Sequence, residues 1–259
     1  TNKDLGQSII KATRLAIKDI NSDLIEIIPK DTQSNPNKTL ESAFELKKNG
    51  IKIVIGPVFY ESLKYLDQIK DITFLSLTNK TLNLPTNVLS AGINSTSQFN
   101  TIKKFLKLNK IKKTISLIPI QDFEFEVKEG IDVSKIKIFK QYSYNTDPTK
   151  LTSQIEEITN YTIRKQNLED EINRIKNSDY LNKEKRIKKL EQRYTLGGVN
   201  FDAIIIADFK ESLKSVSTSL LYTDVSPKNK YFITLNQWFD KNLLNESDIQ
   251  PLYLSLIHI

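Results

Sequence analysis

Phe201-Asp202-Ala203-Ile204-Ile205-Ile206-Ala207 is the stretch of sequence that decides the fold. Such an uninterrupted apolar run between polar segments is typical of a strand buried on both faces, as in a parallel sheet covered by helices. A helical pattern follows at 210–222, and a second apolar strand pattern lies at 231–234. Short strands that alternate with helices predict an α/β fold built on parallel sheets.

The same alternation extends toward the N-terminus and restarts after Pro119, which predicts two Rossmann-like lobes, residues 1–119 and 120–253. The chain enters a helix directly, so we expect the first lobe to lack its first strand. Further strands are expected at 24–28, 51–55, 72–77, 88–91, 113–119 and 136–142, and further helices at 5–20, around 40–46, at 60–70, 96–109 and 121–130, and from 148.

Both ends of the chain have the character of a truncated sequence. Thr1 opens the chain without an initiator Met, so a signal peptide or lipid anchor would lie upstream. The last six residues, 254–259, match the translation of a common sequencing adapter, and we expect them to be an adapter-derived tail. The alternative is a natural terminal strand, which the alternation of apolar residues allows.

Composition excludes several classes of site. The 259 residues include no Cys, so zinc–thiolate sites, iron–sulfur clusters and a cysteine nucleophile are excluded from this stretch. The one His lies in the expected tail, so we predict neither a metal site nor a cofactor. No apolar run approaches the roughly 18–20 residues of a membrane span.

The net charge of +7 comes from 38 basic and 31 acidic residues. Only five of the basic residues are Arg, which nucleic-acid readers favour for bidentate contacts. The Lys excess fits an AT-rich genome, and we do not expect nucleic acid as a partner. An enzyme is also disfavoured, because no glycine-rich phosphate loop and no nucleophile–base–orienter set is visible.

Residues 161–194 break the α/β rhythm with ten basic and six acidic side chains, a local net charge of +4. Two helical patterns flank a turn at 177–179, which predicts a helical hairpin that projects from the second lobe. A solvated extension and a docking arm for a protein partner both remain open. A membrane-surface helix is disfavoured by the alternating charge signs. The docking candidates are Arg164, Lys165, Arg174, Lys185, Arg186 and Lys189.

Polar residues that follow the predicted strands are candidates for a ligand cleft, since loops at the carboxyl edge of an open α/β sheet line the ligand crevice. Short hydroxyls and amides suit a small polar ligand such as an amino acid. Each of these residues also has a structural alternative as a turn, cap or packing residue. The cleft candidates are Gly56, Pro57, Ser76, Thr78, Asn79, Asp208, Gln237 and Trp238.

Three segments of the first half, Asp31-Thr32, 53–57 and 74–79, look like the type I periplasmic-binding-protein fold. Amino-acid receptors of ABC transporters share that fold. Segments of the second half resemble the penicillin-binding-protein activator family as it occurs in alphaproteobacteria: 155–161, 190–198, 201–203, 221–225 and 236–244. This resemblance implies a periplasmic, outer-membrane-anchored lipoprotein, attached to the membrane only through an upstream lipid anchor, which stimulates a bifunctional penicillin-binding protein.

Two classes of function therefore stay open. The first is a non-enzymatic regulator of a peptidoglycan synthase, which the inserted charged hairpin favours because a solute receptor does not need it. The second is a periplasmic receptor whose two lobes close on an amino acid or a similar small polar ligand.

Overall fold

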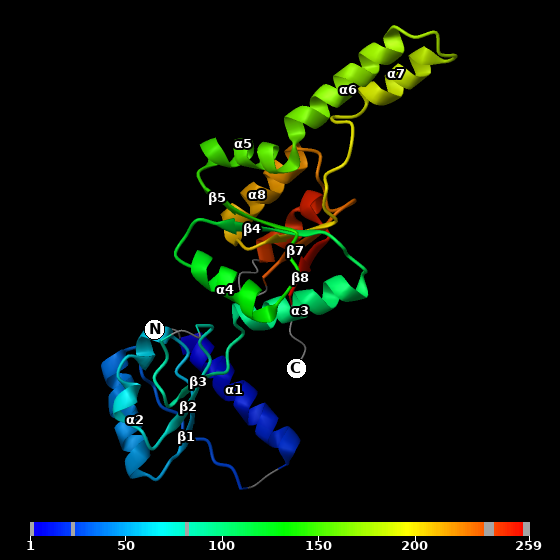
Figure 1. Cartoon of the computed structure of the whole chain (residues 1–259). Helices are drawn as coiled ribbons and strands as arrows, with labels where there is room; N and C mark the ends of the chain where they lie inside the picture. The colour runs from blue at the N-terminus through cyan, green and yellow to red at the C-terminus, as the bar shows by residue number, and fades with distance from the viewer. Residues whose placement is uncertain (1–2, 22–23, 81–82, 236–240, 256–259) are drawn as a thin grey trace. The chain divides into compact units, whose positions relative to one another are not determined.

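The computed structural model describes residues 3–21, 24–80, 83–235 and 241–255 of the chain, which forms two compact units, Thr1–Asn94 and Ser95–Ile259 (Figure 1). The expected lobe boundary near residue 119 is therefore wrong. Strand β4 (Thr114–Pro119) pairs with two strands of the second unit, and helix α3 (Ser95–Leu108) packs beside a helix of that unit. Strand pairing and helix packing place β4 and α3 in the second unit. The alternation of strands and helices in the sequence does not show which strands pair.

The second unit contains a five-stranded parallel sheet in the order β5-β4-β6-β7-β8. Numbered by their sequence within the unit, the strands lie in the order 2-1-3-4-5, which is the order of flavodoxin-like sheets. The apolar run around residue 204 forms a central strand, as predicted. The bounds are β5 (Lys140–Tyr144), β6 (Ala203–Ile206), β7 (Tyr231–Thr234) and β8 (Leu252–Leu254).

Helices cover both faces of this sheet, which confirms the expected architecture. Alternate residues of β6 face opposite ways, so Ile204 and Ile206 join one core cluster while Ile205 joins the other. The first cluster includes residues of α5 (Pro148–Thr159) and α8 (Lys210–Tyr222). The second includes residues of α3 and α4 (Glu124–Ser134).

The first unit holds a three-stranded parallel sheet, β1-β2-β3, with helix α2 beside its core. Its elements are α1 (Lys3–Ile20), α2 (Pro36–Lys48), β1 (Ile53–Ile55), β2 (Thr73–Ser76) and β3 (Val88–Ser90). The helix predicted at 60–70 is wrong in type, because two short 3₁₀ turns, η1 (Tyr60–Leu63) and η2 (Leu66–Gln68), stand there. Leu63, Leu66 and Ile69 are buried at a spacing of three, which is the period of that tighter helix.

The strand predicted at 24–28 is also wrong: the described residues 24–28 form no strand. A strand needs a neighbour for its backbone hydrogen bonds, and the pairing described for β1 is with β2 alone. The strand expected at 136–142 starts later, at Lys140. Ile136 before it is a buried member of the second core cluster.

The charged hairpin is present as predicted. It consists of α6 (Tyr161–Lys176) and α7 (Lys183–Glu191), which pack against each other and extend away from the sheet of the second unit (Figure 1). Asn160, in a left-handed backbone conformation, is the single residue between α5 and α6. Leu168 and Ile175 of α6 are buried, while α7 has no buried residue.

At the C-terminal end, Leu254 belongs to β8, and the buried Ser255 donates a hydrogen bond from Oγ to Oε1 of Gln98 at 2.8 Å. The rest of the expected tail, 256–259, lies outside the described residues. Among the helices described here, none combines the length and the apolar character that a membrane crossing requires.

Candidate functional site

The carboxyl edge of the first sheet gathers five of the predicted cleft residues, those that follow β1 and β2. Ser76 Oγ donates to the Pro57 carbonyl oxygen at 2.7 Å and accepts from the Thr78 backbone N–H at 3.2 Å. Thr78 Oγ1 in turn accepts from the Lys80 backbone N–H at 3.2 Å. Both hydroxyls are buried; that of Ser76 links its loop to the Pro57 loop, and that of Thr78 stabilises the turn of its own loop. Asn79 is the exposed polar side chain of this group.

Gly92 completes this edge, and sequence patterns gave no signal for it. A Cβ atom at Gly92 would lie 2.2 Å from the Thr78 carbonyl oxygen, which no real Cβ contact allows. Ser90 Oγ also donates to that carbonyl, at 2.9 Å. The 76–79 loop is therefore fixed from both sides. Gly56 is buried and Pro57 half-buried beneath it, and the Gly56–Pro57 peptide bond is cis.

The second sheet has its topological switch point between β4 and β6, where open α/β sheets form their ligand crevice. Asp208 follows β6 at this point and is fully buried. Its Oδ2 accepts a hydrogen bond from the hydroxyl of Tyr144, at the end of β5, and its Oδ1 accepts from the Phe209 backbone N–H at 2.8 Å. The phenol therefore joins two strand ends across β4.

Burial sets the electrostatics of this pair. Desolvation raises the pKa of Asp208, although the hydrogen bonds from Tyr144 and Phe209 oppose it. Desolvation and the nearby carboxylate raise the pKa of the Tyr144 phenol, so it stays a hydrogen-bond donor. Thr234 Oγ1, at the end of β7, donates to the Ile206 carbonyl oxygen at 3.0 Å. All three side chains are buried and hydrogen-bonded within the chain, so they hold the strand ends together. Tyr144 and Thr234 were missed from sequence.

Two predicted cleft residues, Gln237 and Trp238, lie outside the described residues. Within the described ranges, no three His, Cys, Asp or Glu side chains are grouped so that they could hold a metal ion.

Arg164, one of the six docking candidates, is misplaced in that group because it is only 6% exposed. Its Nε donates to the Gly197 carbonyl oxygen at 3.1 Å, one Nη to the Thr223 carbonyl oxygen at 3.0 Å, and the other to Thr195 Oγ1 at 2.7 Å. The second Nη also lies 3.7 Å from Asp224 Oδ2. Desolvation lowers the pKa of Arg164 while Asp224 opposes the shift.

These contacts make Arg164 the anchor of the hairpin. The segment after α7 returns to it, since the Leu196 backbone N–H donates to the Arg164 carbonyl oxygen at 2.9 Å. Thr195 Oγ1 also donates to Asp224 Oδ2 at 2.6 Å. One side chain therefore ties the first turn of α6, the segment after α7 and the end of α8 together. A buried guanidinium with so many partners is a structural group.

The far end of the hairpin has a different arrangement. Arg174 donates two hydrogen bonds to the Glu171 carboxylate, at 2.7 and 2.8 Å. The guanidinium carbons of Arg174 and Arg186 lie 5.9 and 4.8 Å from the centroid of the Tyr180 ring. Each pair is within cation–π range. Leu181, next to this ring, is 92% exposed.

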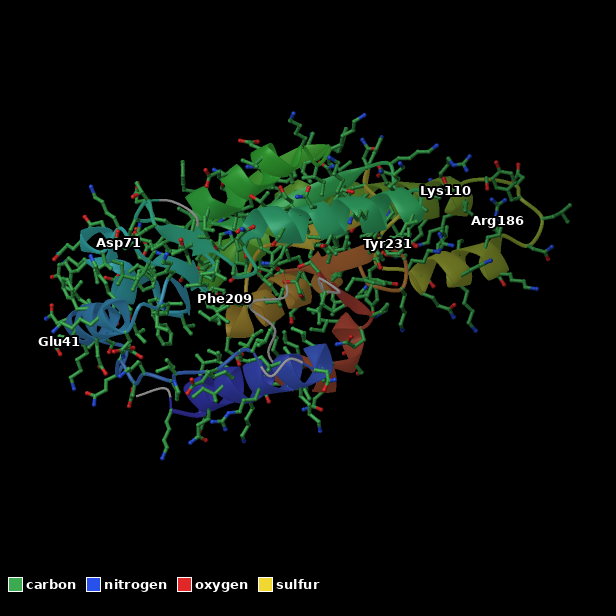
Figure 2. The ribbon with its side chains drawn as sticks, turned by 90° about the horizontal axis from the view of Figure 1, so that it is seen from below. Glu41, Asp71, Lys110, Arg186, Phe209 and Tyr231 are labelled. Carbon is green, nitrogen blue, oxygen red and sulfur yellow. The ribbon has the colours of Figure 1, made fainter. Side chains whose placement is uncertain are left out.

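The remaining docking candidates, Lys165, Lys185, Arg186 and Lys189, are all exposed. In the part of the chain that the structure describes, no carboxylate lies within 4 Å of a charged nitrogen of α7. Figure 2 shows Arg186 on the hairpin, well away from Phe209 in the body of the same unit. The hairpin thus has a buried base, where Arg164 is paired, and an exposed far end, where Arg174 is paired with Glu171 and the described α7 cations have no carboxylate within 4 Å.

Sheet order, layering and these edges define the class: the chain has the α/β fold of type I periplasmic binding proteins. No protein-family model and no curated protein sequence matches the chain, so the likeness comes from solved structures. The leucine-, isoleucine-, valine-, threonine- and alanine-binding protein of Brucella ovis matches 96% of this chain and 60% of its own, with a TM-score of 0.55 and 13% identity.

A second likeness is to LpoA of Haemophilus influenzae. Its C-domain, described as a regulator of PBP1A, matches 84% of this chain with a TM-score of 0.53 and 16% identity. Full-length LpoA matches 85% with a TM-score of 0.55 and 16% identity. The chain spans 57% of the C-domain and 34% of the full-length chain. These likenesses establish the shared fold.

Proposed function

We propose that this chain belongs to a non-enzymatic bacterial envelope protein that activates a bifunctional peptidoglycan synthase through its α6–α7 hairpin. One observation carries the proposal: the hairpin is anchored by the buried Arg164, while the cations of α7 are exposed without a carboxylate partner among the described residues. An anchored base and exposed α7 cations suit an element that presents charge to another molecule.

The fold likeness to LpoA supports the identity of the partner. That protein is described as a regulator of PBP1A, and the corresponding partner here is a bifunctional penicillin-binding protein. The likeness to binding proteins of the ABC-transporter class supports a periplasmic location. A lipid anchor upstream of this chain, on the outer membrane, completes the proposal.

The test replaces residues 165–194 with a short Gly-Ser linker in the full-length protein. The backbone of Arg164 and Leu196 is already hydrogen-bonded at 2.9 Å, so a short linker can join the two ends, and Arg164 itself is kept. We expect glycan polymerisation by the synthase to lose its stimulation, while circular dichroism and the thermal melt of the body stay cooperative. Undiminished stimulation by a folded variant would exclude the hairpin as the activating element.

A receptor for an amino acid or a similar small polar ligand is the second candidate function. The exposed Asn79 at the carboxyl edge of the first sheet favours it, since loops at that edge of open α/β sheets bind ligands. A ligand at about 100 times its Kd adds roughly 2.7 kcal/mol to native stability. A thermal-shift screen of the full-length protein against amino acids and muropeptides tests it, and Asn79→Ala should weaken binding. Absence of any shift would remove this candidate.

A further inference from the structure

Helix α7 carries a one-sided excess of positive charge. Its sequence KEKRIKKLE holds five basic and two acidic residues, a net charge of +3. Lys185 and Arg186 lie four and three residues before Lys189, so each is a neighbour of Lys189 on the helix surface. Ile187 and Leu190 belong to another face, and both are half-buried. The cationic face is therefore the solvent side of α7.

The end of the hairpin adds an apolar and aromatic centre to this charge. Tyr180 is 43% exposed and lies within cation–π distance of both Arg174 and Arg186. The guanidinium of Arg174 is fixed further by its two hydrogen bonds to Glu171. Leu181 is the neighbouring exposed apolar side chain. Tyr and Arg at the centre of a charged rim are the residues that dominate protein–protein contacts.

We infer that the surface formed by Arg174, Tyr180, Leu181, Lys185, Arg186 and Lys189, the hairpin tip, binds an acidic protein segment that presents an apolar side chain between its carboxylates. The inference rests on the proposed function in one respect: both take the α6–α7 hairpin as the element that docks to a partner. It names the chemistry of the partner: carboxylates meet the α7 cations, and the apolar side chain packs on Tyr180 and Leu181.

Two other anionic partners fit this surface less well. A lipid surface needs a helix with an exposed apolar face, and the apolar residues of α7, Ile187 and Leu190, are half-buried. Nucleic acid is most often read through bidentate Arg contacts, and four of the five basic residues of α7 are Lys. Charge complementarity together with a single apolar anchor favours a folded acidic segment.

The test measures binding of a fluorescent helical peptide of Glu-Glu-Ala-Leu repeats to the whole 259-residue chain at low salt, by fluorescence anisotropy. We expect the combined variant Lys185→Glu, Arg186→Glu, Lys189→Glu to weaken binding about tenfold or more. Lys104→Glu, Lys107→Glu, Lys137→Glu makes the same charge change at exposed positions of the same unit and should bind within about twofold of wild type. Leu181→Ser should weaken binding with the charge unchanged.

Three outcomes would overturn the inference: no binding of the peptide, equal binding by the two charge-reversal variants, or tighter binding to phosphatidylglycerol vesicles than to the peptide. A peptide with Gln in place of Glu is the control for charge. Synthase stimulation, measured separately, distinguishes the two proposals. Peptide binding without stimulation refutes the proposed function alone, and stimulation that survives without peptide binding refutes this inference alone.

Discussion

The base and the tip of the α6–α7 hairpin use the same residue types in opposite ways. At the base, Arg164 is buried and gives its guanidinium to three acceptors within the chain. At the tip, the cations of α7 are exposed, and Arg186 lies over Tyr180. A basic side chain whose donors are used internally stabilises the fold, whereas one left in solvent is available to a partner. This contrast separates Arg164 from the docking surface.

Arg164→Ala should have the largest effect on stability. It leaves the carbonyl oxygens of Gly197 and Thr223 without their donor in a buried site and removes the ion pair with Asp224. We expect the free energy of unfolding to fall by about 3 kcal/mol, measured by urea denaturation. Arg193→Ala, an exposed Arg just after α7, is the matched control and should change it by about 0.5 kcal/mol or less. Equal effects of the two variants would remove the distinction between base and tip.

Tyr144→Phe tests the buried pair that Tyr144 forms with Asp208. The variant keeps the ring in the core and removes the hydroxyl that donates to Asp208 Oδ2. Leaving that buried carboxyl without its partner should lower the free energy of unfolding by about 2 kcal/mol. Tyr142→Phe on the same strand is the control, with an expected change of about 0.5 kcal/mol or less. A Tyr144→Phe value as small as the control value would show that the pair contributes little.

Asp208→Asn should change how stability depends on pH. Desolvation raises the pKa of Asp208 in the folded state, so the folded protein binds the proton more tightly than the unfolded chain does. The contribution of Asp208 to stability is therefore full below the ordinary carboxyl pKa and is lost as the pH rises through the folded-state pKa. Asn does not titrate. The melting temperature of wild type should rise relative to that of Asp208→Asn as the pH is lowered from about 7 to about 4.5.

A melting-temperature difference between these two proteins that is independent of pH, or that changes with the opposite sign, would contradict the stated pKa direction. Differential scanning fluorimetry in buffers of constant ionic strength gives the comparison directly. Other carboxyl groups titrate equally in both proteins, so their contributions cancel in the difference.

The smallest effect on stability is expected at the tip. The combined variant Lys185→Glu, Arg186→Glu, Lys189→Glu should change the free energy of unfolding by about 0.5 kcal/mol or less per position, since all three side chains are exposed. Loss of a cooperative urea transition in this variant would show that the α7 cations hold the fold together, contrary to the contrast drawn with Arg164.

Sequence patterns predicted the elements that carry strong apolar periodicity, such as the strand around Ile204 and the two hairpin helices. They failed where pairing or long-range contacts decide the outcome. Residues 24–28 have the pattern of a strand but no described neighbour, and the 113–119 strand belongs to the second unit because of its partners. Hydrophobic pattern reports which residues are buried, and it does not report which segment lies alongside.

The candidate site residues also divide into those with a local sequence signal and those set by distant contacts. Asp208 was found because it follows a buried strand, but its partner Tyr144 lies 64 residues earlier and has no local signal. Arg164 and Lys185 look alike in a charged helical stretch. Thr195 and Asp224, which hold Arg164, stand within the 190–198 and 221–225 segments that carry the family resemblance. Those segments therefore contain residues that build the hairpin base.

The most direct test of the proposed division of the hairpin measures glycan polymerisation by the bifunctional synthase with three full-length proteins. The first is wild type. The other two are the charge reversal at Lys185, Arg186 and Lys189 and the control charge reversal at Lys104, Lys107 and Lys137. All three should unfold in one cooperative thermal transition. If the α7 cations form the docking surface, the first reversal loses most of the stimulation and the second keeps it. Full stimulation by a correctly folded first reversal would contradict that role for α7.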